Sequence, residues 1–183
     1  MADIILLLIG GFLAGVINTL AGNGSAITLT VLMATGMDAN VANATNRIGV
    51  LSQTLTAVLS LKKSNRTKKL MRDSVWYYWP TIAGSIAGAW LALDIDKEIL
   101  KLVIGGIMLV LLATLLLKPK KWLINTDTYK AKKTPLNIVI FFAIGAYGGF
   151  IQMGIGIMIL SALVLLAHYS LRDANIIKLL VAF

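Results

Sequence analysis

Two long stretches of this sequence carry no charged side chain, and they limit its fold more than any other feature does. Residues 4–37 are uncharged throughout, and residues 134–171 contain only the neutral His168. As straight helices, both would be roughly 50 Å long or more at about 1.5 Å per residue, whereas roughly 20 helical residues cross a bilayer core. Neither stretch fits a membrane as one rod, so each must break or fold back.

The composition indicates an integral membrane protein. Hydrophobic residues make up 58% of the 183 positions and charged residues 14%, and the mean hydropathy is +0.84. Soluble domains carry about 25% charged residues, and one of this size could not bury so much apolar surface. The low charge density excludes a nucleic-acid-binding domain despite the formal net charge of +9. The absence of cysteine excludes a disulfide scaffold, a thiolate metal site and a cysteine nucleophile.

The positive charge is concentrated in two short segments, residues 62–72 and residues 118–133. Together they hold twelve of the 17 Lys and Arg residues. Cytoplasmic loops of membrane proteins carry such an excess of positive charge, so we expect both segments to be cytoplasmic. An interaction of these segments with acidic lipid or nucleic acid is the weaker interpretation.

The remaining segments predict an all-α polytopic membrane protein of two related repeats, each opening with a glycine-broken transmembrane helix. The first repeat covers residues 1–117, a basic cytoplasmic loop covers 118–135, and a truncated second repeat covers 136–183. The predicted elements are a broken helix at 4–36, spans at about 44–61, 75–93 and 99–117, a second broken helix at 136–168, and the start of a further span at 174–183.

The topology depends on how the broken helices run. If each makes one net crossing, the N-terminus is cytoplasmic, the acidic turn at 94–98 is external, and the two repeats are parallel. Asp38 and Asp173 are both expected in external turns. A re-entrant course of residues 26–36 changes this parity, and the sequence leaves that choice open.

Glycine marks the predicted breaks, at residues 21–25 (AGNGS) and 153–156 (MGIG). Glycine frees backbone groups that hydrocarbon cannot satisfy, so such breaks persist where they are buried in protein or line a water-filled cavity. Both stretches contain the ordered pattern G-x-x-x-G-x-x-(N/Q)-x-x-x-G, beginning at Gly11 and at Gly145. The same series twice in one chain indicates an internal duplication.

The residues around both breaks resemble a known family. The segment GFLAGVINTLAGNGSAITL, followed by VANATNRIGVLSQTLTAV, is similar to the first repeat of the TauE/SafE sulfite-exporter family of membrane permeases. The segment GAYGGFIQMGIGIMIL, followed by DANIIKLL, is similar to the second repeat. The resemblance implies a multi-pass carrier in the bacterial inner membrane for sulfite, an organosulfonate or a related small organic anion.

The sequence departs from this family in two places. Asn23 stands in the first break, where the family more often has glycine. The family also continues beyond the helix that begins near residue 174, whereas residues 175–183 are far short of the roughly 20 needed to cross a bilayer. We therefore expect this chain to be a fragment.

Polar residues and glycines near the breaks form the candidate binding site for the small anion. Arg47 and Lys178 each follow an Ala-Asn motif, and no acidic residue lies within a predicted span to neutralise them. A cation inside a membrane is costly, so we expect both to balance a bound anion; an Arg47 that reaches the outer interface is the alternative. We expect Asn18 and Gln152 to face each other across the repeat interface. The predicted set is Asn18, Gly22, Gly24, Ser25, Asn43, Thr45, Asn46, Arg47, Gln152, Gly154, Gly156, Asn175 and Lys178.

Three further patterns concern single helices. A polar stripe predicts a face directed into the bundle, for interhelical hydrogen bonds or for a substrate path. An aromatic run at residues 76–79 predicts an interfacial belt. Gly84 and Gly88 predict close helix packing, within the chain or in a homo-oligomer. The stripe consists of Asn46, Gly49, Gln53, Thr56 and Ser60.

The sequence favours a transporter over an enzyme. It has no carboxylate pair, metal-binding motif or nucleophile–base set, so we expect no catalytic residue, metal or cofactor. The leading hypothesis is a secondary carrier whose partners are a small anion and the lipid bilayer. A channel or lipid translocator, which would give flux that does not saturate, is one alternative. An accessory membrane subunit, which would not transport alone, is the other.

Overall fold

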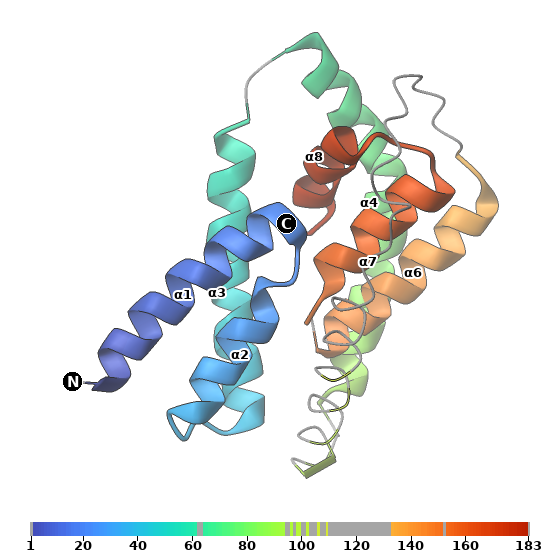
Figure 1. Cartoon of the computed structure of the whole chain (residues 1–183). Helices are drawn as coiled ribbons and strands as arrows, with labels where there is room; N and C mark the ends of the chain where they lie inside the picture. The colour runs from blue at the N-terminus through green and yellow to red at the C-terminus, as the bar shows by residue number, and fades with distance from the viewer. Residues whose placement is uncertain are drawn as a thin grey trace.

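A computed structural model of the chain describes residues 2–61, 64–93, 96, 98, 99, 102, 106, 109, 133–151 and 153–182. Its elements are α1 (Ala2–Ala21), α2 (Gly24–Ala34), α3 (Ala39–Leu59), α4 (Asn65–Leu91), α6 (Pro135–Phe150), α7 (Ile155–Ser161), the π-helical η2 (Ala162–Leu166) and α8 (Leu171–Ala182) (Figure 1). The all-α prediction is confirmed. Most of the predicted span at 99–117 and of the basic loop at 118–135 lies outside the described residues. No single helix among the described residues has both the length and the hydropathy of a membrane crossing.

The first broken stretch folds back on itself. α1 ends at Ala21, and Gly22 takes a left-handed conformation with φ +77°, which glycine adopts without strain. α2 then runs antiparallel to α1, since Gly24 lies against Ala14 and Val31 lies against Gly10. Of the two courses left open by the sequence, the re-entrant one is therefore found, and the break lies within the predicted residues 21–25.

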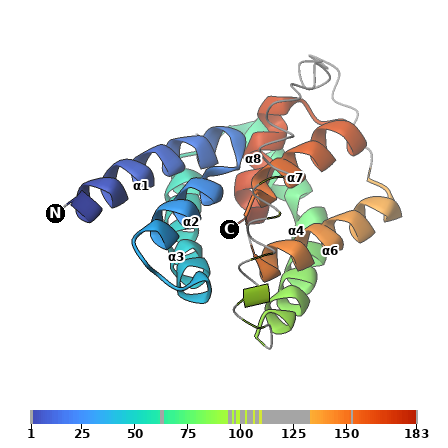
Figure 2. The ribbon, with the colours of Figure 1, turned by 60° about the horizontal axis from the view of Figure 1, so that its bottom comes forward.

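The second broken stretch also forms a hairpin. α6 ends at Phe150, and Gly154 has φ +71° immediately before α7. The Tyr147 hydroxyl donates a hydrogen bond to the Met153 carbonyl at 2.6 Å, which ties the end of α6 to the turn. α7 returns along α6 in both views of the ribbon (Figures 1 and 2). The break covers residues 151–154, two residues earlier than predicted, so Gly156 lies inside α7.

Glycines hold α4 and α6 together as parallel neighbours. A Cβ on Gly84 or Gly88 would overlap the backbone of α6, and one on Gly145 or Gly149 would overlap the backbone of α4. The predicted close packing at Gly84 and Gly88 therefore occurs within the chain. Because the two helices are parallel, both begin on the same side of the molecule.

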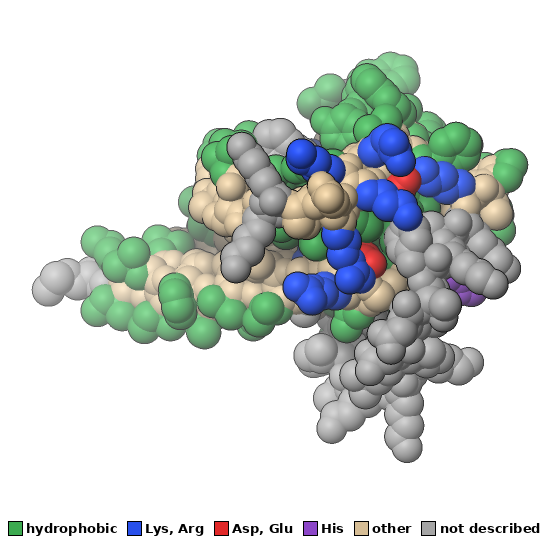
Figure 3. All heavy atoms as spheres, turned by 90° about the horizontal axis from the view of Figure 1, so that it is seen from above, with side chains coloured by type: hydrophobic (Ala, Val, Ile, Leu, Met, Phe, Trp, Pro, Cys, Tyr) green, Lys and Arg blue, Asp and Glu red, His purple; other side chains and the backbone are tan. Residues whose placement is uncertain are grey.

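That side carries the basic residues. Lys and Arg side chains gather there with acidic side chains among them (Figure 3). Lys133, just before α6, forms an ion pair with Asp73 of α4 at 2.8 Å. The C-terminal ends of the two basic segments, residues 62–72 and 118–133, therefore lie on the same side of the molecule. A common cytoplasmic location, as predicted, requires this.

The beginning of α8 lies on this basic side as well. Arg66 in the first turn of α4 forms a bidentate pair with the buried Asp173, with both nitrogen–oxygen distances at 2.9 Å. This hydrogen-bonded carboxylate raises the pKa of the Arg66 guanidinium. The expectation that Asp173 lies opposite the basic segments is wrong, because the α6–α7 hairpin returns the chain to the side from which it came.

The two repeats are consequently inverted rather than parallel. The first hairpin opens toward the side where α3 begins, and the second opens toward the side where α4 and α8 begin (Figure 1). α3 and α8, the helices that follow the hairpins, run in opposite directions. The prediction of parallel repeats required one net crossing per broken stretch, and neither stretch makes one.

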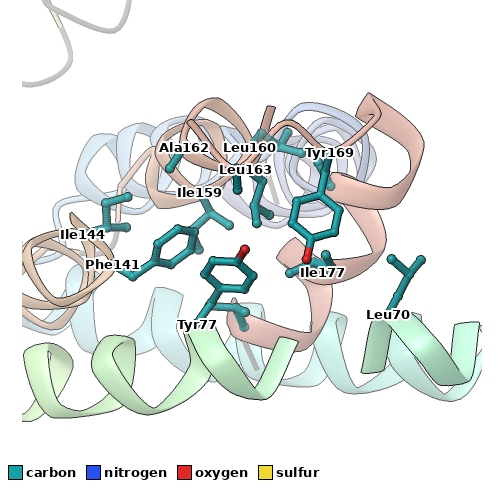
Figure 4. Close-up of a cluster of buried hydrophobic side chains, with 13 residues drawn as sticks. Leu70, Tyr77, Phe141, Ile144, Ile159, Leu160, Ala162, Leu163, Tyr169 and Ile177 are labelled. Carbon is teal, nitrogen blue, oxygen red and sulfur yellow. The ribbon is translucent and has the colours of Figure 1, made fainter. Parts of the chain in front are cut away.

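An apolar cluster among the described residues joins α4, α6, α7, η2 and α8 (Figure 4). Tyr77 is fully buried there, with its ring centroid 4.6 Å from that of Phe141 and 6.1 Å from that of Tyr169. The predicted interfacial belt is therefore wrong for Tyr77, which faces the core. Trp76 and Trp79 are exposed, as residues of such a belt would be.

The predicted inward direction of the polar stripe on α3 is wrong for three of its five residues. Gly49, Thr56 and Ser60 are exposed among the described residues. The Thr56 and Ser60 hydroxyls donate to backbone carbonyls four residues earlier, so these side chains need no polar neighbour. The buried face of α3 instead consists of Ala39, Ala42, Asn43, Asn46, Val50 and Thr54.

Candidate functional site

The turn at Gly22 in the first break contacts the first turn of α7, which directly follows the second break. A Cβ on Gly22 would lie 2.5 Å from the Cα of Gly156, so neither position has room for a side chain. Gly24 packs equally tightly against the Ala14 carbonyl of α1. Glycine is therefore required here by the approach of two backbones as well as by the turn at Gly22.

A small cavity of about 20 Å³ adjoins this contact, enough for about one water molecule. Five helices line it, α1, α2 and α3 from the first repeat and α7 and α8 from the second, and five of its residues belong to the predicted site. The lining residues are Asn18, Gly22, Ser25, Val50, Gln53, Thr54, Ile155, Gly156, Lys178, Leu179 and Ala182.

Lys178 brings a positive charge into this cavity. Only 2% of the residue is exposed, and its ammonium donates hydrogen bonds to the carbonyls of Asn18 at 3.2 Å and Thr19 at 2.9 Å. Both carbonyls lie in the last turn of α1, which carries partial negative charge. The Asn18 carbonyl also accepts from the Gly22 N–H at 2.9 Å, whereas the last carbonyls of a helix in general lack helical partners. An ammonium has three N–H donors, so one remains for another acceptor. No ion pair involves Lys178 within the described part of the chain.

Gln53 of α3 organises the same turn of α1. Its Nε2 donates to the Gly15 carbonyl at 2.6 Å and to the Thr19 hydroxyl at 2.7 Å, and its Oε1 accepts from the Asn18 amide at 2.9 Å. The side chain of Asn18 therefore pairs within its own repeat, while its carbonyl contacts Lys178 of the other. The predicted pairing of Asn18 with Gln152 stays a prediction, because Gln152 lies outside the described residues.

Arg47 lies at the end of the other broken helix and does not line the cavity. Its Nη2 donates to the Gly149 and Phe150 carbonyls in the last turn of α6, the latter at 3.1 Å. Asn43, one turn earlier on α3, donates to the same Phe150 carbonyl at 3.2 Å. Two backbone oxygens of α6 thus accept hydrogen bonds from Nη2 of this guanidinium.

The remaining predicted residues lie in buried or partly buried positions, in a turn or on the surface. Asn46 is buried with its Nδ2 unbonded in the described structure, and Asn175 of α8 has an unbonded Oδ1. Gly154 forms the left-handed turn before α7. Thr45 is exposed, and its hydroxyl lies 3.8 Å from the sulfur of Met37, away from the cavity.

The predicted set omitted six of the eleven lining residues: Ile155, Leu179 and Ala182, and on α3 Val50, Gln53 and Thr54. Gln53 was identified as part of the polar stripe but not as part of the site. Spacings of three and four residues from Asn46 reach the three positions on α3, so the helical period there contains the signal. Within the described residues, no group of three or more His, Cys, Asp and Glu side chains could hold a metal ion.

Comparison with known proteins identifies related sequences. A family profile described as sulfite exporter TauE/SafE matches residues 7–183. A probable membrane transporter protein of Haemophilus influenzae is 29% identical over 90% of this chain and 63% of its own length. The probable membrane transporter protein YfcA of Escherichia coli K12 is 27% identical over 89% of this chain and 60% of its own length. The chain therefore matches about three fifths of these relatives, and no solved structure matches it.

Proposed function

The chain belongs to the sulfite exporter TauE/SafE family, and on that premise we propose that it forms the substrate site of a secondary membrane carrier. The substrate is a small anion such as sulfite, an organosulfonate or a related organic anion. The site is the cavity beside the contact of Gly22 with Gly156. The relatives of this chain are named probable membrane transporter proteins, which supports a transport role in general. The residues of the cavity support an anion as the substrate.

The buried charge of Lys178 is the observation that carries this proposal. A cation at depth in a membrane costs at least about 2.5 kcal/mol unless it is paired, and such residues commonly mark substrate or ion paths. The carbonyls of Asn18 and Thr19 balance Lys178 only in part, since a helix C-terminus carries roughly half an elementary charge. A bound anion would complete the neutralisation through the remaining N–H donor.

The arrangement of the repeats supports a carrier. Secondary transporters often bind substrate between inverted repeats, where discontinuous helices meet near the middle of the bilayer. Here two broken helices from inverted repeats meet at the cavity, and each repeat contributes lining residues. The cavity has room for about one water, so an oxyanion must widen it, and the described conformation corresponds to a closed site.

Uptake of radiolabelled sulfite into proteoliposomes that contain the full-length protein tests this function. The wild type should give saturable uptake. Lys178→Gln should weaken the apparent affinity roughly tenfold or more, because a hydrogen bond to a charged group is worth about 1.5–3 kcal/mol. Lys68→Gln, which removes an exposed lysine of α4, is the matched control and should behave as the wild type.

Three outcomes would contradict the proposal. Equal apparent affinities for the wild type and Lys178→Gln would place the anion elsewhere. Uptake that rises linearly with sulfite concentration would indicate a channel. No uptake of sulfite or of small organosulfonates, by a correctly inserted protein, would indicate an accessory subunit.

A further inference from the structure

Each repeat supplies the cation that meets the end of the other repeat's broken helix. Arg47 belongs to α3 of the first repeat and donates to the last carbonyls of α6 in the second. Lys178 belongs to α8 of the second repeat and donates to the last turn of α1 in the first. The two contacts are reciprocal, so the ends of both broken helices are held from across the repeat interface.

The two cations differ in what else they can reach. Lys178 lines the cavity, whereas Arg47 does not. Asn43 reinforces the Arg47 contact, because its side-chain amide donates to the same Phe150 carbonyl. Asn43 is buried, with 6% of the residue exposed. Two donors from adjacent turns of α3 therefore hold one end of one helix, directly before the turn at residues 151–154.

We propose that Arg47 is a positioning residue: it fixes the end of α6, and through the turn it holds Gly156 against Gly22. This inference rests on the proposed function, because the contact that Arg47 maintains forms one wall of the anion cavity. Arg47 keeps its backbone partners when the anion binds, and Lys178 is the cation that meets the substrate. A role for Arg47 in direct anion binding is thereby replaced by a role in the geometry of the second break.

The physical basis is the set of acceptors that the break creates. The last carbonyls of a helix have no N–H partner within it, and hydrocarbon cannot supply one. A guanidinium and an amide from α3 satisfy the Gly149 and Phe150 carbonyls and so make the broken helix stable at that point. Without Arg47, the acceptors would be under-satisfied, and the turn would open locally toward water.

A cysteine reporter at the second break tests this role without any substrate. These 183 residues contain no cysteine, and Met153 in the turn is fully buried, so Met153→Cys as the single cysteine of the full-length protein should react slowly with a maleimide. Adding Arg47→Gln should raise the labelling rate roughly tenfold, because local opening governs the reactivity of a buried site. Arg47→Lys should restore part of the protection, since an ammonium can still donate to the carbonyls. Arg72→Gln, an exposed change on α4, should leave labelling unchanged.

Kinetics then separate positioning from binding. Arg47→Gln, without the reporter, should lower the maximal rate of sulfite uptake roughly tenfold and change the apparent affinity by less than about threefold, as expected for a group that does not touch the substrate. If Arg47→Gln does not insert, Asn43→Ala removes a single donor to the same carbonyl and should raise Met153→Cys labelling by a smaller factor.

The outcomes distinguish this inference from the proposed function. Unchanged labelling in Arg47→Gln would overturn the positioning role, whatever the transport result. A loss of sulfite affinity with the reporter still protected would make Arg47 an anion ligand instead. If labelling rises while Lys178→Gln binds sulfite normally, the positioning of the break stands and only the proposed anion site fails.

Discussion

At the end of α1, two side chains from different repeats satisfy neighbouring groups of the same turn. Gln53 binds the Gly15 carbonyl, the Asn18 amide and the Thr19 hydroxyl, and Lys178 binds the Asn18 and Thr19 carbonyls. Gln53 has no charge to offer an anion, so its contribution is to orient the Asn18 amide and to hold the turn. Residues of this kind are expected to affect stability as well as transport.

Gln53→Leu should destabilise the full-length protein by roughly 2 kcal/mol, since it removes three hydrogen bonds worth about 0.6 kcal/mol each in a membrane protein. Thermal unfolding in detergent measures this effect. Ser52→Ala, the adjacent change on the exposed side of α3, is the control and should stay within about 0.5 kcal/mol of the wild type. Equal stabilities for the two variants would show that the Gln53 network contributes nothing measurable.

Sequence patterns indicated residues beside the breaks, but not their partners. The Ala-Asn motifs located Arg47 and Lys178 beside the breaks, and the repeat offset located Gly22 and Gly156. The partner of each cation is a backbone carbonyl in the other repeat, and a carbonyl leaves no mark in an amino-acid sequence. Arg47 therefore looked unsatisfied in the sequence, although it has acceptors in the fold.

Among the elements, the parallel pair of α4 and α6 depends most on small residues. The carbonyls of Phe142 and Ala146 occupy the space above Gly84 and Gly88. Gly11 on α1 offers the opposite environment, because a Cβ there would have no atom within 4 Å. The same substitution at the two kinds of site should consequently have opposite effects.

Gly84→Ala should destabilise the protein by about 1–3 kcal/mol through overpacking of the α4–α6 contact, in spite of the better helix propensity of alanine. Gly11→Ala should be neutral or should stabilise by up to about 1 kcal/mol. The midpoints of thermal unfolding in detergent provide the comparison. A Gly84→Ala protein as stable as the Gly11→Ala protein would mean that the two helices are not packed through this glycine.

The existence of the helices was predictable from the sequence, because charges and glycines delimit them. Which face of each helix is exposed was not predictable. Thr56 and Ser60 appeared as part of an inward stripe, yet each donates its hydroxyl to its own helix. Tyr77 was grouped with two tryptophans in the sequence, and the fold buries it against Phe141 and Tyr169. In each case a local pattern matched two environments, and tertiary packing decided between them.

For the whole molecule, the inversion of the repeats follows from the two hairpins. A broken stretch of this length can make one net crossing or fold back as a hairpin, and the sequence alone did not choose. The close approach of Gly24 to Ala14 in the first repeat, and the return of α7 along α6 in the second, decide the course of both stretches. The inversion places one cavity between the repeats, where a rocking motion could open it to either side of the membrane in turn.

The most direct test of the anion site is protection of a single cysteine at Ser25, which is 4% exposed and lines the cavity. The test uses Ser25→Cys in the full-length protein in proteoliposomes, an impermeant thiol reagent on either side, and a transported organosulfonate such as methanesulfonate. Ser52→Cys, on the exposed side of α3, provides the control. We expect Ser25→Cys to react from both sides, and the organosulfonate at ten times its Kd to slow this reaction roughly tenfold. Lys178→Gln should cut this protection to about twofold or less, because its affinity is at least roughly tenfold weaker. Labelling of Ser25→Cys that transported organosulfonate leaves unchanged would contradict the account, because the anion would then bind outside the cavity where the two breaks meet.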